Sequence, residues 1–256
     1  MLTLKNKIVF ITGATSGIGK SCAYAFAKEG ANLIINARRI GLLNEIADDI
    51  RNKFNVKVFT YELDVRNKQA VIDSISKLPD EWTNIDILIN NAGLAKGLNK
   101  FYDDNPEDWD VMIDTNVKGL LYVTHAILPG MIKRNFGHII NIGSIAGHDA
   151  YPKGAVYCAT KHAVDAITRS LRMDTIDKNI LVSTIDPGLV ETNFSNIRFY
   201  GDKEKAKNVY KGLTPLTGDD VADAVIYCAS RPPHINIAEI TLLAARQASA
   251  TVVHRE

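Results

Sequence analysis

The sequence predicts an α/β fold, in which one doubly wound sheet of seven mostly parallel strands carries helices on both faces. First, apolar runs of strand length alternate with longer amphipathic stretches of helix length. Second, the runs around Ile8, Ile34, Leu88 and Ile139 are apolar at consecutive positions, as expected of parallel strands buried on both faces. Third, the 256 residues suffice for one sizeable domain and contain no linker-like segment. We therefore expect a single domain over residues 1–256.

The expected strands are short runs rich in Ile and Val, because β-branched side chains favour an extended backbone. In chain order they are Lys7–Thr12, Ala31–Ala37, Val56–Tyr61, Ile85–Ile89, His138–Ile142, Ile180–Ile185 and Ile237–Leu243. Helices are expected between and around them, where apolar residues recur at helical spacing. These are Gly17–Glu29, Leu42–Lys53, Lys68–Leu78, a long region from about Pro106 to Lys133, Ala155–Asp177 and Asp219–Ser230.

Glycine and proline are expected to set several helix ends. Gly30 fits the position after the first helix, and Pro79 ends the third. Pro106 suits a first helical turn, whereas Pro129 is expected to kink or end the long region. Residues 189–212 are polar and irregular, so we expect short helices and a loop there.

The composition excludes several classes of protein. Hydrophobic residues make up 46% and charged residues 23%, which excludes a disordered or collagen-like chain. The 30 basic and 29 acidic residues give a net charge of +1, so we expect no nucleic-acid or anionic-membrane partner. The longest apolar stretch, near Gly119–Ile132, is too short to span a bilayer.

The cysteine pattern and the N-terminus predict a cytoplasmic protein. Cys22, Cys158 and Cys228 are odd in number and scattered, which argues against disulfides and for a reducing compartment. The N-terminal residues MLTLKNKIVF lack the apolar core and cleavage site of a signal peptide. No Cys or His spacing typical of a metal site occurs, so no metal is expected.

A glycine-rich turn, Thr12–Gly19 (TGATSGIG), joins the first expected strand to the first helix. In this GxxxGxG pattern, Gly13 permits a tight turn, Gly17 lets the backbone approach a pyrophosphate, and Gly19 lets the helix pack closely. Free N–H groups and the positive end of the helix dipole then favour phosphate binding. A glycine-rich turn alone is weak evidence, but its position between strand and helix favours a dinucleotide.

The second strand indicates which dinucleotide. An NAD site would place an acidic residue at its end, yet none occurs between Leu33 and Leu42. Arg38 and Arg39 stand there instead, and guanidinium groups pair well with a 2′-phosphate. The alternative is a solvated basic turn. The missing acid and the two arginines together predict NADP.

A second set of residues suggests acid–base chemistry. Tyr157 and Lys161 are four residues apart on a helix, so both project from one face, about 6 Å apart along the axis. A nearby ammonium is expected to lower the phenol pKa and make a general acid/base. Ser144 follows the fifth strand and can polarise a substrate oxygen. Taken alone, Tyr157 and Lys161 also fit an exposed pair on a helix surface, and Ser144 also fits an ordinary turn residue. Cys158 is expected to be a packed core thiol rather than a redox switch.

The order of these motifs resembles the short-chain dehydrogenase/reductase family over essentially the whole chain. The matching motifs are TGATSGIG at 12–19, Leu63-Asp64-Val65, Asn90-Asn91-Ala92-Gly93, Asn116, Ser144, Tyr157-x-x-x-Lys161 and Pro187-Gly188. The resemblance implies a Rossmann-type fold and a catalytic set of Asn116, Ser144, Tyr157 and Lys161. In that set Tyr157 is the acid/base, Ser144 binds the reacting oxygen, Lys161 holds the nicotinamide ribose and Asn116 positions a relay water.

The motifs and the resemblance together give the expected cofactor contacts. They are Gly13, Thr15, Ser16, Gly17, Ile18, Gly19, Arg38, Arg39, Asp64, Val65, Asn91, Ala92, Gly93, Tyr157, Lys161, Pro187, Gly188, Val190 and Thr192. The resemblance implies that Asp64 and Val65 contact adenine and that Asn91 lies along the adenosine. It implies that residues 187–192 wrap the nicotinamide end.

A narrower similarity points to one branch of the family. It is carried by Gly143–Gly147, Tyr151-Pro152, Pro187–Ser195, Arg198-Phe199 and Gly201-Asp202. That branch oxidises small 3-hydroxy acids such as L-serine, L-allo-threonine and 3-hydroxypropionate with NADP. It implies a cytosolic homotetramer. Hydride would pass between the 3-carbon and the nicotinamide while Tyr157 takes the hydroxyl proton.

A carboxylate substrate needs a cation near the reacting centre. Arg198 and Lys153 are the candidates, within or near a substrate loop at 189–212, although both also fit exposed loop charges. Two alternatives stay open: a reductase of another carbonyl, such as a 3-oxoacyl thioester or a ketosteroid, and a non-catalytic NADP-sensing protein.

Overall fold

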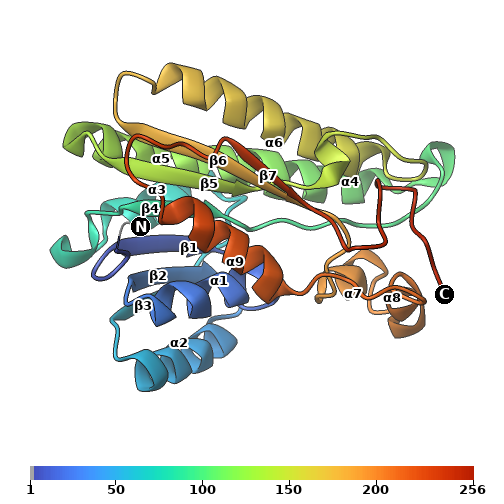
Figure 1. Ribbon diagram of the computed structural model, residues 1–256, viewed down its shortest axis with the longest axis horizontal. Coiled ribbons are helices and arrows are strands. Elements are labelled where there is room, and N and C mark those ends of the chain that lie inside the picture. The colour runs from blue at the N-terminus through green and yellow to red at the C-terminus, as the bar shows by residue number, and fades with distance from the viewer. Residues whose placement is uncertain (1–2) are drawn as a thin grey trace.

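Seven strands form one sheet in the order β3-β2-β1-β4-β5-β6-β7 (Figure 1). They are β1 Ile8–Thr12, β2 Asn32–Ala37, β3 Val58–Glu62, β4 Ile87–Asn90, β5 Gly137–Ile142, β6 Ile180–Pro187 and β7 Glu239–Leu242. This computed structural model describes residues 3–256. Every neighbouring pair of strands is parallel, which confirms the doubly wound, Rossmann-type fold expected from the sequence.

Helices cover both faces of this sheet. The α-helices are α1 Gly17–Lys28, α2 Ile40–Phe54, α3 Lys68–Ser76, α4 Pro106–Ile113, α5 Leu120–Arg134, α6 Ala155–Asp174, α7 Phe194–Arg198, α8 Lys203–Asn208 and α9 Gly218–Ala229. The shorter elements are η1 Asp80–Trp82, η2 Phe101–Asp103, the π-helix η3 Asp114–Gly119 and η4 Ile145–Gly147. In Figure 1, α1, α2 and α9 lie on one side of the sheet, and α4, α5 and α6 on the other.

Two buried cores, one on each face, explain why the strand sequences are continuously apolar. Along β1, Val9 faces the core that contains Phe26 of α1, and Phe10 faces the core that contains Met131 of α5. All four side chains are fully buried. Because successive side chains of a strand point to opposite faces, a strand between two helical layers must be apolar at every position.

The long helical region differs from the expectation at Pro129. The chain forms α4, the π-helix η3 and α5 in succession, and α5 continues through Pro129 to Arg134. Pro129 therefore does not end the helix. Its ring and the residue four positions earlier, His125, are exposed, so solvent can satisfy the carbonyl that loses its N–H partner. The π-helix had no signal in the sequence.

Other helix ends agree closely with the expectation. Gly30 follows α1 with a left-handed backbone (φ 79°), as its place after the helix predicted. Helix α6 stops at Asp174, three residues before the expected end, where the Thr175 hydroxyl and N–H both bond to the carbonyl of Leu171. The irregular segment 189–212 contains the short helices α7 and α8.

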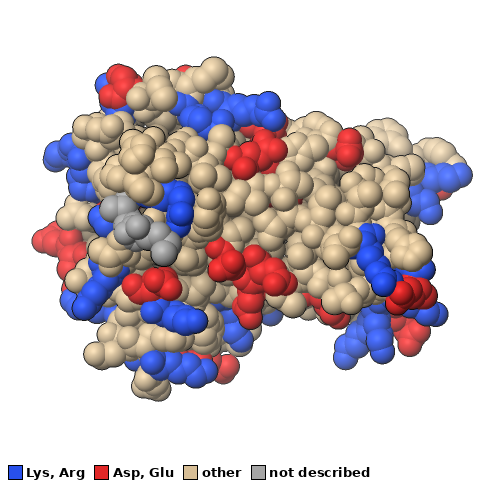
Figure 2. All heavy atoms as spheres, in the orientation of Figure 1, with Lys and Arg blue, Asp and Glu red and all other residues tan. Residues whose placement is uncertain are grey.

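The surface carries charges of both signs. On the face shown in Figure 2, Lys and Arg side chains alternate with Asp and Glu side chains around broad uncharged areas. Among the described residues, no helix is both long enough and apolar enough to cross a lipid bilayer.

The parallel sheet fixes where a ligand can bind. The segments that leave β1, β4, β5 and β6 all emerge at the same edge of the sheet, because the four strands run in one direction. Gly13, Asn91, Ser144 and Pro187 therefore come together although they are far apart in the sequence. The candidate site is built at this edge.

Candidate active site

A cavity of about 660 Å³ opens at the carboxyl edge of the sheet. Of the residues expected from the sequence, it is lined by Gly13, Thr15, Ser16, Gly17, Ile18, Arg38, Arg39, Asp64, Val65, Asn91, Ala92, Gly93, Ser144, Tyr157, Lys161, Pro187, Gly188, Val190, Thr192 and Arg198. Gly19, Asn116 and Lys153 do not line it. The residues at one end are those of the glycine-rich turn, and Tyr157, Ser144 and Arg198 belong to the other.

The turn between β1 and α1 has the shape that a diphosphate requires. Gly13 and Gly17 adopt left-handed backbone conformations, with φ of 69° and 54°. A Cβ on Gly17 would come within 3.1 Å of the Thr192 side chain, so glycine leaves the backbone accessible between the turn and Thr192. The N-cap Ser16 makes no side-chain hydrogen bond to the first turn of α1, which leaves that turn available to an anion. These residues fit a bound dinucleotide.

Asn91 and Gly19 support this turn from behind. The Asn91 amide donates hydrogen bonds to the carbonyls of Thr12 and Gly13, at 2.9 and 3.2 Å. A Cβ on Gly19 would lie 2.3 Å from that amide nitrogen, so only glycine allows α1 to approach. The Asn91 side chain is thus committed to the turn. Gly19 acts through close packing rather than by contact with a ligand.

The basic end of the cavity is formed after β2. Arg38 and Arg39 are exposed and line the cavity, and Arg39 donates from Nη2 to the Thr15 hydroxyl at 2.9 Å. Asp64 is paired with Arg66, whose Nε lies 2.9 Å from Oδ1. Hydrogen bonding to Arg66 lowers the pKa of Asp64, and the charge of Arg38 acts in the same direction. The paired Asp64 leaves the two arginines as a site for a phosphate.

Tyr157, Lys161 and Ser144 converge at the other end. Tyr157 and Lys161 project from one face of α6, and the Lys161 Nζ is 5.9 Å from the centre of the Tyr157 ring. Lys161 donates to the carbonyl of Ile142, at the end of β5, at 2.8 Å. The Ser144 hydroxyl accepts from the N–H of Ala146 at 3.1 Å. The Tyr157 ring packs against Phe194 with centroids 5.6 Å apart, which encloses the phenol.

The electrostatics of Tyr157 differ from the expectation. Burial raises the pKa of the phenol, Tyr151 adds to this effect, and Ser144 and Arg198 offset only part of it. Lys161 is not among the groups that shift it. Burial lowers the pKa of Lys161 itself to about 8, against the opposing charge of Asp186. Desolvation therefore outweighs the neighbouring cation, and the phenol is neutral at pH 7.

Arg198 reaches this end of the cavity from α7. Its guanidinium carbon lies 5.4 Å from the centre of the Tyr157 ring and 5.7 Å from that of Tyr151. Nη2 donates to the Tyr151 hydroxyl at 3.0 Å, and Nε donates to the carbonyl of Gly97 at 3.1 Å. Two anchors thus hold a cation beside the phenol. An anionic group bound in the cavity can pair with the remaining N–H donors.

Lys153 and Asn116 do not line the cavity. Lys153 is exposed in a left-handed turn before α6 (φ 68°), so it does not reach the cavity. The Asn116 amide is buried in η3. It accepts from the N–H of Leu94 at 2.9 Å and donates to the Leu94 carbonyl at 2.8 Å and to the Thr160 hydroxyl at 3.0 Å. Its side chain joins η3 to α6 and has no free group facing the cavity.

The lining residues outside the expected set include Tyr151 and Gln247. Tyr151, which orients Arg198, lines the cavity, and Gly154 leaves room for its ring, because a Cβ there would lie 2.2 Å away. Gln247 returns from the C-terminal tail, where its Oε1 accepts from the N–H of Leu189 at 2.9 Å. Tyr151 lies in the branch motif Tyr151-Pro152, which did not indicate its contact with Arg198, and Gln247 has no sequence signal because its contact joins distant segments. Cys158 is buried beside Leu94, as its assignment to the core predicted.

Comparisons with known proteins agree with this architecture. The NADP-dependent 3-hydroxy acid dehydrogenase of Schizosaccharomyces pombe is 45% identical, over 100% of this chain and 99% of that protein. Sulfoacetaldehyde reductase 2 of Chromohalobacter salexigens is 41% identical, over 97% and 99%. Among solved structures, the closed form of serine dehydrogenase complexed with NADP+ is 43% identical with a TM-score of 0.90, and the match covers 97% of this chain and 100% of that one.

The family assignment rests on one further match. The model of the short chain dehydrogenase family matches residues 7–200, which include the glycine-rich turn, Ser144, Tyr157 and Lys161. Together with relatives above 40% identity along almost the whole chain, this match settles the family. The chain belongs to the short chain dehydrogenases.

Proposed function

We propose that this protein is an NADP-dependent dehydrogenase of small 3-hydroxy acids, such as L-serine, L-allo-threonine or 3-hydroxypropionate. The reverse reaction reduces a 3-oxo acid or a semialdehyde. The observation that carries the proposal is the Arg198 guanidinium, anchored 5.4 Å from the centre of the Tyr157 ring within the cavity. The names of the yeast relative and of the solved serine dehydrogenase support it. We further propose a cytoplasmic homotetramer, which the family resemblance implies.

In this proposal the cofactor spans the cavity from the basic end to Tyr157. The turn Gly13–Gly17 and the first turn of α1 hold the diphosphate, and Arg38 and Arg39 hold the 2′-phosphate. Lys161 and residues 187–192 hold the nicotinamide end. When bound, NADP supplies the hydride acceptor or donor that the protein itself lacks.

The substrate is oriented by charge at one end and by hydroxyl groups at the other. Its carboxylate pairs with Arg198, whose planar donors suit a carboxylate. Its 3-oxygen lies between the hydroxyls of Ser144 and Tyr157. This orientation turns the 3-carbon toward the nicotinamide side of the cavity. The proposed substrates share a carboxylate at carbon 1 and a hydroxyl at carbon 3.

The proton steps follow from the burial of Tyr157. Because its pKa is raised, the phenol carries its proton at pH 7 and can give it to the alkoxide that develops in reduction. In oxidation the phenolate takes the hydroxyl proton. Ser144 donates a hydrogen bond to the reacting oxygen in both directions. Asn116 acts by position, because its amide ties η3 to Thr160 of α6.

Other readings share the same fold. A sulfonate can pair with Arg198 as a carboxylate does, and one relative is named a sulfoacetaldehyde reductase. The family also leaves open a 3-oxoacyl thioester or ketosteroid reductase, and a non-catalytic NADP sensor. Initial rates with 3-hydroxypropionate, isethionate and an acetoacetyl thioester, each with NADP(H), separate these. Fastest turnover of the hydroxy acid supports the proposal, and tight NADP binding without any turnover contradicts it.

We expect Arg198→Gln to lower kcat/KM for 3-hydroxypropionate by roughly 10- to 100-fold, the cost of one charge-assisted pair. The rate with propan-1-ol, which has the hydroxyl but no carboxylate, should hardly change. Lys153→Gln is the matched control, because that cation is exposed and outside the cavity. An equal fall of kcat/KM with both substrates would mean that Arg198 does not bind the carboxylate.

Tyr157→Phe removes the phenol oxygen and keeps the ring against Phe194. Turnover in both directions should fall by about 10²- to 10⁴-fold, the usual contribution of a general acid/base. NADPH affinity, measured by fluorescence titration, should stay within a few-fold. Tyr227→Phe, on the exposed side of α9, serves as the control. Near-normal turnover in Tyr157→Phe contradicts the assigned role.

Arg38→Gln and Arg39→Gln test the choice of cofactor. Each should raise the KM for NADP about tenfold or more, because a guanidinium–phosphate pair is lost. The kinetics with NAD are the internal control, since NAD lacks the 2′-phosphate. Unchanged KM for NADP in both variants would rule out this phosphate site.

A further inference from the structure

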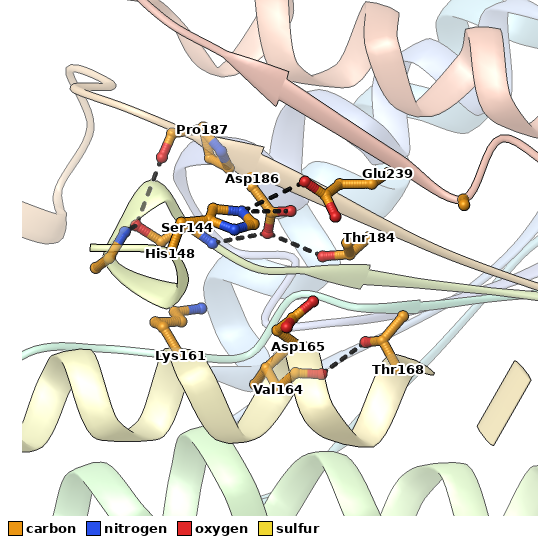
Figure 3. A network of polar contacts seen from close by, with 12 residues as sticks. Ser144, His148, Lys161, Val164, Asp165, Thr168, Thr184, Asp186, Pro187 and Glu239 are labelled. Carbon is orange, nitrogen blue, oxygen red and sulfur yellow. Dashed lines mark hydrogen bonds and ion pairs between the residues drawn. The ribbon is translucent and has the colours of Figure 1, made fainter. Parts of the chain in front are cut away.

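A second cluster of polar side chains lies beside the active site but does not line its cavity. It consists of His148 after η4, Asp186 near the end of β6 and Glu239 at the start of β7 (Figure 3). The Nε2 of His148 is 3.3 Å from Oδ2 of Asp186 and 3.7 Å from Oε1 of Glu239. All three donor atoms lie within 4.8 Å of one another. Figure 3 shows the three side chains directed toward a common point.

The sheet register brings these residues together. Glu239 pairs with Thr184 across β6 and β7, and Asp186 lies two residues after Thr184. The side chains of Thr184, Asp186 and Glu239 therefore lie on the same face of the sheet. Gly143 leaves room for the Asp186 carboxylate, because a Cβ on Gly143 would lie 1.8 Å from Oδ1 of Asp186. His148 reaches the same point from the turn after β5. No sequence spacing predicted this cluster, because its members come from three separate segments.

Asp186 has an oxygen that the fold leaves without a hydrogen bond. The side chain is only 4% exposed. Its Oδ1 accepts from the N–H of Ser144 at 3.0 Å and from the Thr184 hydroxyl at 2.9 Å. Its Oδ2 is buried and has no hydrogen-bond partner among the described residues. The Nε2 of His148 lies 3.3 Å from this oxygen and forms an ion pair with it only when the imidazole is protonated, which a metal-ligating imidazole is not. A buried carboxylate oxygen without a donor is costly, so it calls for a cation.

We propose that His148, Asp186 and Glu239 bind a divalent transition-metal ion such as Zn²⁺. In a tetrahedral zinc site with bonds of about 2.0–2.2 Å, the ligand atoms are about 3.3 Å apart. The observed separations of 3.3 and 3.7 Å are close to that value. One imidazole and two carboxylates suit zinc, whereas calcium and magnesium prefer oxygen ligands alone. Solvent supplies the fourth ligand.

Charge and access are compatible with this ion. The carboxylates of Asp186 and Glu239 balance a charge of 2+. Arg169 lies 3.6 Å from the other oxygen of Glu239 and is also paired with Asp165 at 2.8 Å. Lys161, which interacts with the charge of Asp186, donates its hydrogen bond to the carbonyl of Ile142 instead. His148 and Glu239 are 28% and 36% exposed, so the ion can enter from solvent.

The ion would join three segments of the fold. It links the turn after β5 to the ends of β6 and β7, and β7 is an edge strand with one neighbour. Asp186 connects it to the active site, because its other oxygen holds the backbone of Ser144. The site is therefore structural and stands whether or not the proposed hydroxy-acid activity is correct.

Zinc binding to the full chain tests the proposal. Protein stripped with a chelator is titrated with Zn²⁺ against a chromophoric chelator, and its thermal unfolding is followed with and without Zn²⁺. We expect one Zn²⁺ per chain and a rise of the unfolding midpoint with Zn²⁺ concentration. Mg²⁺ at the same concentration should give no such rise.

Variants assign the ligands. His148→Ala and Glu239→Gln should each weaken zinc binding by about tenfold or more and remove the midpoint shift. His234→Ala, at another exposed position, should leave both unchanged. Circular dichroism identifies any variant that fails to fold. Glu239→Gln keeps the test valid if His148→Ala fails to fold, because Glu239 is exposed and Gln has the same shape as Glu. No saturable binding of Zn²⁺ to the unmodified protein, or binding in both ligand variants as tight as in the unmodified protein, overturns the proposal.

Discussion

Parallel pairing of β1, β4, β5 and β6 is the constraint on which the rest of the structure depends. Because these strands point the same way, the segments that follow them meet at one edge. The glycine-rich turn comes from β1, Asn91 from β4, Ser144 from β5 and Pro187 from β6. The helical crossovers between the strands keep them parallel, and their side chains are buried on both faces of the sheet.

Burial also sets the character of the active site. Tyr157 is enclosed by α6 and by Phe194 of α7, and this desolvation keeps the phenol protonated. The same enclosure lowers the pKa of Lys161 and strengthens any charge pairing with Arg198. Burial at this end of the cavity therefore supports both the proposed proton transfer and the proposed pairing with an anion.

Much of this could be predicted from the sequence, because the strands, the turn at 12–19 and the pair Tyr157–Lys161 are encoded by local patterns. What could not be predicted depends on tertiary contacts. Lys153 turns outward in a left-handed loop, and α5 continues through Pro129 because that residue is exposed. The pKa of Tyr157 moved opposite to the expectation, since sequence spacing places a charge but does not report desolvation. Tyr151 and the cluster around Asp186 join segments that no spacing rule connects.

The central claim is that one buried phenol, Tyr157, transfers the proton in both directions. The most direct measurement is the pH dependence of kcat/KM of the unmodified protein, for 3-hydroxypropionate oxidation and for reduction of the matching semialdehyde. Oxidation needs the phenolate, so its rate constant should rise with pH. Reduction needs the phenol, so its rate constant should hold through neutral pH and fall only in the alkaline range. Profiles that change in the same direction for both reactions would contradict the account.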